Sequence, residues 1–283
     1  MMGAQAIHRL RRQAGRTLLY STVLTVVFVT TFPILWTLFC TFKSKPDLFK
    51  LPIEVWPERF TLDNYVVTWK TTPISLYLRN SLLVAVGATI ITVLVAALAA
   101  YSLSRFPFRG KEKVAQGVLM GYMLPPILLT VPYFILFTRL RLINTFGGLM
   151  LAHASGSLPF AIWLLWTFFQ TIPQEIEDAA KIDGAGRVRV LSSIFLPLAA
   201  QGIAASGTLT FISSWNNYLF SSVIAAANKV QTLPMAIALM TGRDMLRWEV
   251  MLAFCGIMIY VVFILLAVFQ RQLLKGFSAA YLK

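Results

Sequence analysis

The chain has 283 residues, of which 58% are hydrophobic and 13% are charged, and its mean hydropathy is +0.72. Soluble domains are about 45–50% apolar, so this composition excludes an ordinary soluble protein and favours a membrane protein. The formal net charge is +14, but the basic residues stand at the ends of apolar runs. We therefore interpret them as topology signals and contacts with lipid headgroups, and we expect no nucleic-acid partner.

Six apolar runs are each long enough to cross a bilayer, which takes about 20 residues. They lie at residues 17–39, 81–104, 114–137, 148–169, 198–225 and 250–270. The sequence therefore predicts an all-α fold, that of a polytopic membrane protein with six transmembrane helices. Residues 17–270 would form one transmembrane domain, preceded by a segment at 1–16 and followed by a tail at 271–283.

The orientation of these runs follows from the basic residues next to them. Four arginines precede the first run and favour a cytoplasmic N-terminus, namely Arg9, Arg11, Arg12 and Arg16. The first run is too long for the apolar core of a signal peptide, so we expect it to stay attached as a membrane helix. Six crossings would then place both termini, and the loop between the fourth and fifth runs, in the cytoplasm.

A few residues inside the runs carry structural signals. Pro125, Pro126 and Pro132 lie in the third run, where we expect them to kink the helix. His153 lies in the fourth run, and no second His, Cys or carboxylate has a spacing that would complete a metal site with it. We therefore expect His153 to form a hydrogen bond between helices.

None of the six runs contains Asp, Glu, Lys or Arg. Proton-coupled carriers keep ionisable residues inside the membrane, so the lack of them argues against a secondary transporter. The Walker A, HExxH and GxSxG patterns are also missing from the sequence. We therefore expect a protein that is not an enzyme and binds no cofactor itself, and that depends on a partner for energy.

The segment between the fourth and fifth runs is the most charged part of the second half of the chain. Pro173 suits the first turn of a helix, because its missing N–H would have no partner there in any case. Negative charge follows at the positive end of the helix dipole, from Glu175, Glu177 and Asp178.

Gly184 is suited to end this helix, because glycine adopts the left-handed conformation at little cost. Residues 188–195 can form a second short helix, which Pro197 closes. We therefore predict a cytoplasmic helix–turn–helix at residues 173–197.

One side of the first of these helices is small and flat. Ile176, Ala179, Ala180 and Asp183 share that side by their i, i+3, i+4, i+7 spacing. The two alanines would let another surface approach the backbone closely.

The same segment resembles a known motif. Asp178-Ala179-Ala180, Gly184 and Ile194-x-Leu196-Pro197 match the EAA loop of permease subunits in binding-protein-dependent ABC importers. The motif reads Glu-Ala-Ala, three residues, Gly, nine residues, Ile-x-Leu-Pro, and every gap agrees, with Asp178 in place of Glu. The chain resembles this family from about residue 80 to residue 276. It is most similar to the carbohydrate branch, in particular the smaller permease of maltose-type systems.

The resemblance implies a permease subunit of an ATP-driven importer for a sugar or related polyol. The protein would lie in the plasma (inner) membrane of a bacterium or archaeon. Its partners would be a second permease, two copies of a cytoplasmic ATPase subunit that bind ATP and Mg, and an extracytoplasmic solute-binding protein. The implied ATPase-coupling residues are Glu175, Glu177, Asp178, Ala179, Ala180, Asp183, Gly184, Ile194, Leu196 and Pro197.

A polar and aromatic sequence ends the fifth run, at Trp215, Asn216, Asn217 and Tyr218. The family has a Trp-Asn-Asp-Phe version, so Asn217 stands where the family carries an acidic residue. These four side chains could contact sugar rings along a substrate pathway, or they could bridge helices inside the bundle. Both interpretations stay open.

Rival functions also stay open at this point. The chain could be a permease for another solute such as glycerol phosphate, or a membrane scaffold whose loop docks a different cytoplasmic protein. It could also be an ion-coupled carrier that uses backbone carbonyls and Asn side chains. Co-purification of ATPase subunits would support the importer, and uptake that collapses with an ion gradient would support the carrier.

Overall fold

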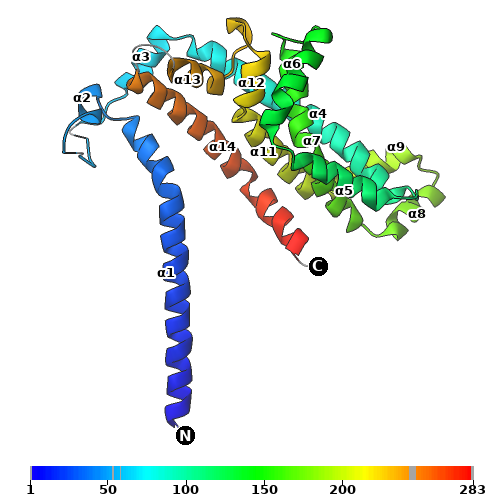
Figure 1. The fold of residues 1–283 in the computed structure, drawn as a ribbon. Helices are drawn as coiled ribbons and strands as arrows, with labels where there is room; N and C mark the ends of the chain where they lie inside the picture. The colour runs from blue at the N-terminus through cyan, green and yellow to red at the C-terminus, as the bar shows by residue number, and fades with distance from the viewer. Residues whose placement is uncertain (1, 53, 58, 242–246, 282–283) are drawn as a thin grey trace. The chain divides into compact units, whose positions relative to one another are not determined.

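The computed structural model describes the backbone of residues 2–52, 54–57, 59–241 and 247–281 (Figure 1). It also describes their side chains, except those of residues 2–12, 228 and 273–281. Every regular element in this part of the chain is a helix, which confirms the all-α prediction. The chain divides into two compact units, Met1–Thr72 with Arg247–Ile259, and Pro73–Leu246 with Tyr260–Lys283.

The first unit contains one long helix, two short ones and the beginning of another long one. They are α1 (Met2–Cys40), α2 (Lys45–Leu48), α3 (Asp63–Thr71) and the first part of α14 (Trp248–Tyr281). The Asn64 amide donates to the carbonyls of Thr41 and Lys43, at 2.9 and 2.8 Å. These bonds tie α3 to the end of α1, because both carbonyls directly follow that helix.

The second unit holds the remaining elements and the rest of α14. Its α-helices are α4 (Ile74–Arg105), α5 (Lys111–Tyr122), α6 (Thr130–Arg139), α7 (Phe146–Gln170), α8 (Gln174–Ile182), α9 (Arg187–Val190), α10 (Leu196–Leu198), α11 (Ala200–Trp215), α12 (Leu219–Ile224) and α13 (Leu233–Thr241). A π-helical turn at Leu191–Phe195 joins α9 to α10, and 3-10 turns lie at Pro126–Leu129 and Asn228–Val230.

The centre of the second unit is formed by α4, α7 and α11, which pack against one another (Figure 1). Small residues line the α4 side of this contact, with Ala88, Ala96 and Ala100 fully buried. From α7, Ala152 and Leu165 are buried to the same degree. Small side chains let helices approach closely in a membrane, where packing rather than the hydrophobic effect drives association.

Four helices are long and apolar enough to cross a membrane, in residues Gln13–Cys40, Ile74–Arg105, Phe146–Gln170 and Trp248–Gln272. Two further pairs of helices pass the same test only if each bent pair counts as one span. The described part of the chain therefore offers four to six spans, in agreement with a polytopic membrane protein.

The third predicted span is broken rather than gently kinked. Lys111–Tyr122 and Pro126–Arg139 meet at an angle of 91°. The break falls at Pro125 and Pro126, which lack the N–H that would continue the helix ladder. The predicted kink is confirmed at Pro125 and Pro126, whereas Pro132 lies in the first turn of α6 and does not interrupt that helix.

The fifth predicted span, residues 198–225, was wrong as a single helix. A bend of 79° separates Arg187–Leu198 from Ala200–Trp215, and α12 starts only after a turn at residues 216–218. The side-chain oxygen of Asn217 accepts a hydrogen bond from the Phe220 N–H at 3.0 Å, which satisfies a free donor at the start of α12. The polar residues thus end one helix and begin another.

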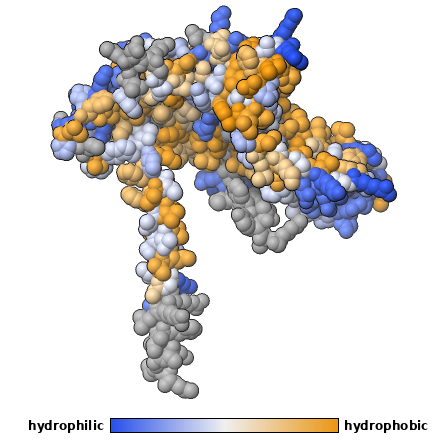
Figure 2. Space-filling view, viewed as in Figure 1, coloured by the Kyte–Doolittle hydropathy of each residue, from blue (hydrophilic) through white to orange (hydrophobic). Residues whose placement is uncertain are grey.

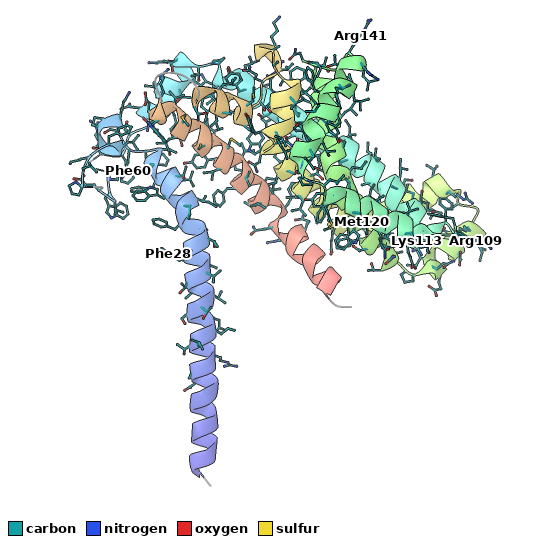
Figure 3. All side chains as sticks on the ribbon, in the orientation of Figure 1. Phe28, Phe60, Arg109, Lys113, Met120 and Arg141 are labelled. Carbon is teal, nitrogen blue, oxygen red and sulfur yellow. The ribbon has the colours of Figure 1, made fainter. Side chains whose placement is uncertain are left out.

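Polar side chains mark two ends of the second unit. Hydrophilic residues gather over the end that carries α8 and α9 (Figure 2). Arg109 and Lys113 lie at that end, whereas Arg141 lies at the opposite end, just after α6 (Figure 3). This arrangement fits a unit whose apolar middle lies in a bilayer. Of the predicted tail at 271–283, the backbone continues α14 to Tyr281, and residues 282–283 lie outside the described residues.

Candidate functional site

The predicted helix–turn–helix is present. The first helix, α8, follows Pro173 directly and ends at Ile182. Gly184 has a φ of +78°, and its N–H donates to the Lys181 carbonyl at 3.0 Å. The next N–H, from Ala185, donates to the Ala180 carbonyl at 2.9 Å. These two bonds form a complete Schellman motif, so the prediction that Gly184 ends the helix in the left-handed conformation is confirmed.

The second helix of the pair is not regular. Residues Arg187–Leu198 run through a short α-helix, a π-helical turn and a last α-helical turn. Pro197 lies two residues after the end of the π-helical turn and has no N–H to donate to that turn. The 79° bend to α11 follows at Ala199. This segment therefore connects α8 mechanically to α11.

The solvent-facing side of α8 and α9 is rich in apolar residues. Ile182 is 87% exposed and Val188 is 81% exposed, and Ile176 and Ala179 are also exposed. Sequence reasoning named Ile176 and Ala179 but missed Ile182 and Val188. Both residues stand close to Gly184, on either side of the predicted turn, and this position could have indicated that they are exposed. Exposed apolar residues gathered in this way are typical of a surface that binds another protein.

Glu177 does not belong to this exposed surface, although the family resemblance implied it as an ATPase-coupling residue. Its side chain is 6% exposed and lies 3.1 Å from the Nε of Arg105. Ala180 is also buried, against the cluster that contains Ala100 and Phe195. Both residues are buried because they lie at i and i+3 on the same face of α8, and that face packs against the rest of the chain.

Arg105, at the end of α4, joins four elements at this point. Besides the Glu177 carboxylate of α8, its guanidinium contacts two carbonyls at the end of α7, those of Phe169 and Ile172. Its Cζ also lies 4.7 Å from the ring centroid of Phe195, in the π-helical turn. A cation is favourable at a helix C-terminus and over an aromatic face.

Lys181 completes the charge arrangement on α8. Its Nζ lies 2.9 Å from Glu177 and 3.3 Å from Asp178. The hydrogen bond to the Glu177 carboxylate, with a smaller contribution from Asp178, raises the pKa of Lys181 above its usual 10.5. Lys181 therefore stays protonated throughout the physiological range. Asp178 remains about half exposed and can contact a partner.

A polar cavity of about 340 Å³ lies among the helices of the second unit. Its hydroxyl and amide groups come from Tyr122, Tyr133, Ser155, Ser157, Ser213 and Asn217. The Tyr133 hydroxyl lies 2.9 Å from that of Ser155, and the Tyr133 ring stacks on Phe220 with centroids 5.1 Å apart. The described residues that line the cavity include no Asp, Glu, Lys or Arg. Uncharged hydroxyl groups next to aromatic rings match the chemistry of a neutral polyol.

The four candidate substrate-pathway residues lie in different environments. Trp215 is 1% exposed and stacks on Phe211, so it is not open to a solute. Asn216 is exposed, and its amide donates to the Ile212 carbonyl of its own helix at 3.1 Å. Tyr218 is 45% exposed but does not line the cavity, whereas Asn217 does. The structure therefore brings only Asn217 together with the cavity, and it leaves Trp215 buried outside the cavity lining.

His153 forms the expected bonds between helices. Its Nδ1 lies 2.8 Å from the Ser214 hydroxyl of α11, and its Nε2 lies 3.2 Å from the Ser221 hydroxyl of α12. The prediction of an interhelical role for His153 is confirmed. The buried ring is also part of the lining of the polar cavity, and it fixes the two helices that carry Asn217 between them.

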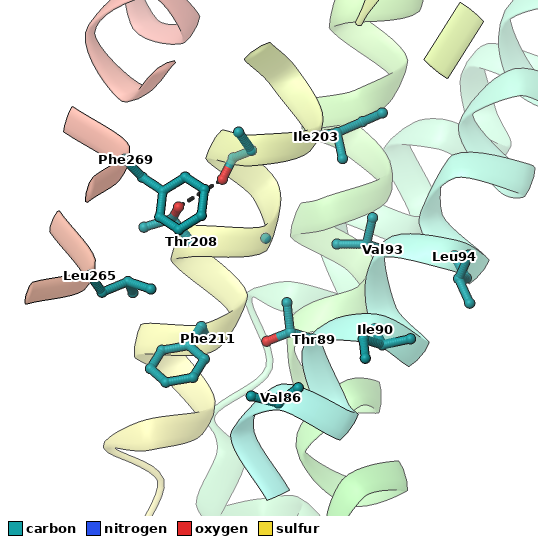
Figure 4. Close-up of a pocket in the computed structure, with 12 residues that line it drawn as sticks. Val86, Thr89, Ile90, Val93, Leu94, Ile203, Thr208, Phe211, Leu265 and Phe269 are labelled. Atoms are coloured by element: carbon teal, nitrogen blue, oxygen red, sulfur yellow. Dashed lines mark hydrogen bonds between the residues drawn. The ribbon is translucent and has the colours of Figure 1, made fainter. Parts of the chain in front are cut away.

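A second cavity, of about 490 Å³, has the opposite character (Figure 4). It lies among α4, α11 and the later part of α14, and its walls include Val93, Phe211 and Leu265. Two threonines also line it, but both hydroxyls bond to their own helices: Thr89 to the Ala85 carbonyl and Thr208 to the Ala204 carbonyl, each at 2.7 Å. This cavity therefore presents an apolar surface and has no free group that would bind a sugar.

The structure defines a class of membrane protein. It has membrane-length helices and an amphipathic helix–turn–helix at one polar end, and its sequence lacks the motif that would bind nucleotide phosphates. These features define a membrane-embedded subunit with an exposed apolar surface on which another protein can act. Residues 92–278 match the family described as the binding-protein-dependent transport system inner membrane component, and the chain belongs to this family.

Relatives of known name support the assignment along most of the chain. The chain is 33% identical to the sulfoquinovosyl glycerol transport system permease protein of Agrobacterium fabrum, covering 89% of this chain and 88% of that protein. It is 30% identical to the trehalose/maltose transport system permease protein of Thermococcus litoralis, covering 95% and 97%.

The fold is also found among solved structures. A bacterial ABC transporter that imports the acidic polysaccharide alginate has a chain with a TM-score of 0.78 and 19% identity, covering 92% of this chain and 97% of that one. A chain of the methionine ABC transporter in an inward-facing conformation gives a TM-score of 0.55 and 17% identity, covering 73% and 99%. These similarities confirm the fold that the EAA-loop resemblance implied.

Proposed function

We propose that this chain is one permease subunit of an ATP-driven importer for a sugar or related polyol. The observation that supports this most directly is the exposed helix–turn–helix, since a permease without its own nucleotide site needs a surface on which an ATPase acts. The solute class is supported by the relatives named for sulfoquinovosyl glycerol and trehalose/maltose transport. The uncharged hydroxyl-lined cavity supports the same class.

The complete importer would contain a second permease, two copies of a cytoplasmic ATPase subunit and an extracytoplasmic solute-binding protein. ATP and Mg would bind to the ATPase subunits, and this chain would be non-catalytic. Both termini and residues 173–197 would lie in the cytoplasm. The arginines that precede the apolar run at 17–39, together with Arg109, Lys113 and Arg187 at the end that carries α8, agree with a cytoplasmic position.

The coupling contact would use the exposed side of the loop. Ile176, Ala179, Ile182 and Val188 would enter an apolar groove on the ATPase, the usual way in which one protein holds the helix of another. Glu175, Asp178 and Asp183 would contact basic groups on the rim of that groove. Ile194, Leu196 and Pro197 would act from within this chain, because they connect the loop to α11.

The experiment that tests the function is purification of the complex followed by uptake into proteoliposomes. An importer is expected to co-purify with ATPase subunits and to accumulate solute only with ATP and the binding protein. Uptake that persists without ATP and collapses with an ion gradient would establish the carrier instead. A bound cytoplasmic protein other than an ATPase would establish the scaffold.

Asn217 offers a test of the solute pathway. Asn217→Leu should raise the solute concentration for half-maximal uptake by about tenfold, because one buried hydrogen-bonding group left without its partner costs about 1–3 kcal/mol. ATPase activity without solute should change little. The measurement is uptake against solute concentration in proteoliposomes.

Two variants separate this effect from the cap that Asn217 provides to α12. Asn217→Asp keeps the oxygen that accepts from the Phe220 N–H and should preserve the fold. Asn216→Leu, on the exposed neighbour, should leave uptake unchanged. If Asn217→Leu lowers the amount of assembled protein as much as it lowers uptake, Asn217 acts in helix bridging alone.

A further inference from the structure

Arg105 and Glu177 form an ion pair inside the chain, away from the exposed surface of the loop. Both side chains are nearly buried, with 11% and 6% exposed. They come from elements far apart in the sequence, the end of α4 and the first turns of α8. Neither side chain is on the exposed side of the loop, so neither is needed to bind a partner there.

The pair is held from several directions. The Tyr101 hydroxyl, one turn before Arg105 on α4, donates to the Glu177 carboxylate at 3.4 Å. The guanidinium is held in turn by the carbonyls at the end of α7 and by the face of Phe195. The Phe195 ring also packs edge-on against Tyr101, with centroids 5.0 Å apart. The charges therefore occupy a defined position rather than a flexible one.

This geometry has a mechanical consequence. Two opposite charges taken out of water attract strongly. Separating them leaves the buried Arg105 without its counter-ion, and it leaves Glu177 with only the exposed Lys181 as a cationic partner. A movement of α8 therefore moves the end of α4, and through the two carbonyls it moves the end of α7 as well. The chain path from α8 is different, since it runs through Gly184 and residues Arg187–Leu198 to the bend before α11.

We propose that Arg105 and Glu177 are positioning residues that carry the displacement of α8 directly to α4 and α7, in parallel with the chain path to α11. The inference rests on the proposed function, in which an ATPase displaces α8. It assigns Glu177 to transmission inside this chain instead of ATPase contact. The two connections act on helices that pack against one another, since the ion pair reaches α4 and α7 and the chain path reaches α11.

The test measures solute transported per ATP hydrolysed, per assembled complex, in proteoliposomes. Glu177→Gln and Arg105→Gln keep approximate size and remove one charge each. Each should lower the ratio about fivefold or more, the usual lower size of a coupling between sites, while the amount of bound ATPase stays at the wild-type level. The double variant should be no worse than the poorer single variant, because both lose the same connection.

The chain offers matched controls on its exposed surface. Glu112→Gln removes a negative charge at the start of α5, as Glu177→Gln does on α8. Arg109→Gln removes a positive charge in the turn before α5, as Arg105→Gln does on α4. Both Glu112 and Arg109 are exposed. Both should keep the wild-type ratio. Arg105→Lys retains the charge with fewer donors, and it should give an intermediate ratio. If Arg105→Gln reduces the amount of assembled complex, the ratio measured for Arg105→Lys still tests the role of this residue.

The outcomes distinguish the two proposals. If the wild-type protein carries no ATPase or shows no ATP-dependent uptake, the proposed function itself is wrong. If the wild-type complex is coupled and Glu177→Gln and Arg105→Lys keep its ratio, the pair has no part in transmission. Loss of bound ATPase in Glu177→Gln at normal amounts of folded permease would return Glu177 to the docking surface and overturn the inference.

Discussion

Gly184→Val is expected to leave the protein in the membrane but to uncouple ATP hydrolysis from solute uptake. The residue has a φ of +78°, a conformation that costs a side chain with a Cβ about 1 kcal/mol or more, and a β-branched one most. Space is not the limit, since no atom lies within 4 Å of an added Cβ. To escape the strain, α8 would run on past Ile182 and lose the two bonds of the Schellman motif.

The exit angle from α8 would then change, and the exposed apolar residues on α9 would no longer align with those on α8. If the misalignment costs about 1.4 kcal/mol, ATP-dependent uptake should fall at least tenfold. The loss should come either from weaker ATPase binding or from ATP hydrolysis that no longer drives transport. The measurement is ATPase co-purification together with uptake per ATP hydrolysed.

Two other variants make this prediction specific to the backbone. Gly184→Asn should retain most of the uptake, because Asn tolerates the left-handed region better than other residues do. Gly186→Ala lies two residues later in open space with an ordinary extended backbone, and it should behave as the wild type. Normal uptake and full ATPase binding in Gly184→Val would show that this loop is not the coupling surface.

Gly148→Ala is expected to give the largest loss of folded protein among single-methyl changes. A Cβ at this position would overlap the carbonyl oxygen of Leu142, which is backbone and cannot rotate away. That carbonyl is also held in place, because it accepts from the Thr145 hydroxyl at 2.8 Å. The Leu142 N–H in turn donates to the Phe137 carbonyl at 2.8 Å.

The Thr145 hydroxyl additionally accepts from the Gly148 N–H at 3.0 Å, which caps the start of α7. Relieving the overlap would therefore disturb the cap of a helix at the centre of the second unit. We expect a loss of about 1–3 kcal/mol or more in stability, as for other overpacked sites. Thermal unfolding in detergent, followed by size-exclusion chromatography, measures it.

Gly147→Ala is the matched control for this change. Its added Cβ would meet nothing within 4 Å, and the position lies inside the same first turn of α7. We expect its unfolding temperature to equal or slightly exceed that of the wild type, because Ala restricts the unfolded chain. Equal unfolding temperatures for the two variants would contradict the steric argument at Gly148.

The sequence alone determined the features that depend on local rules. The length of the apolar runs predicted an all-α membrane protein, because backbone groups in lipid must be satisfied within a helix. The acidic first turn of α8 and the position of Gly184 predicted the helix–turn–helix, because capping and glycine conformation act over a few residues. The fixed spacing from Asp178 to Pro197 then indicated the family.

The tertiary structure decided which side of each helix faces the chain itself. Helical spacing placed Ala180 on a side open to another surface, and the family resemblance implied Glu177 as a coupling residue, but both are buried against α4 and the π-helical turn. Burying a charged carboxylate is costly unless a partner compensates it, and Arg105 does so from a distant part of the chain. No local pattern contains that pairing.

The same limit applies to the breaks in the helices and to the polar cavity. Hydropathy counts apolar residues without regard to direction, so it joined residues 198–225 across two turns. Tyr133, Ser155 and Ser213 gave no signal in the sequence, because single hydroxyl side chains are common in membrane helices. Only the packing of α7 against its neighbours brings them to one cavity with Asn217, since their separations along the chain follow no helical period.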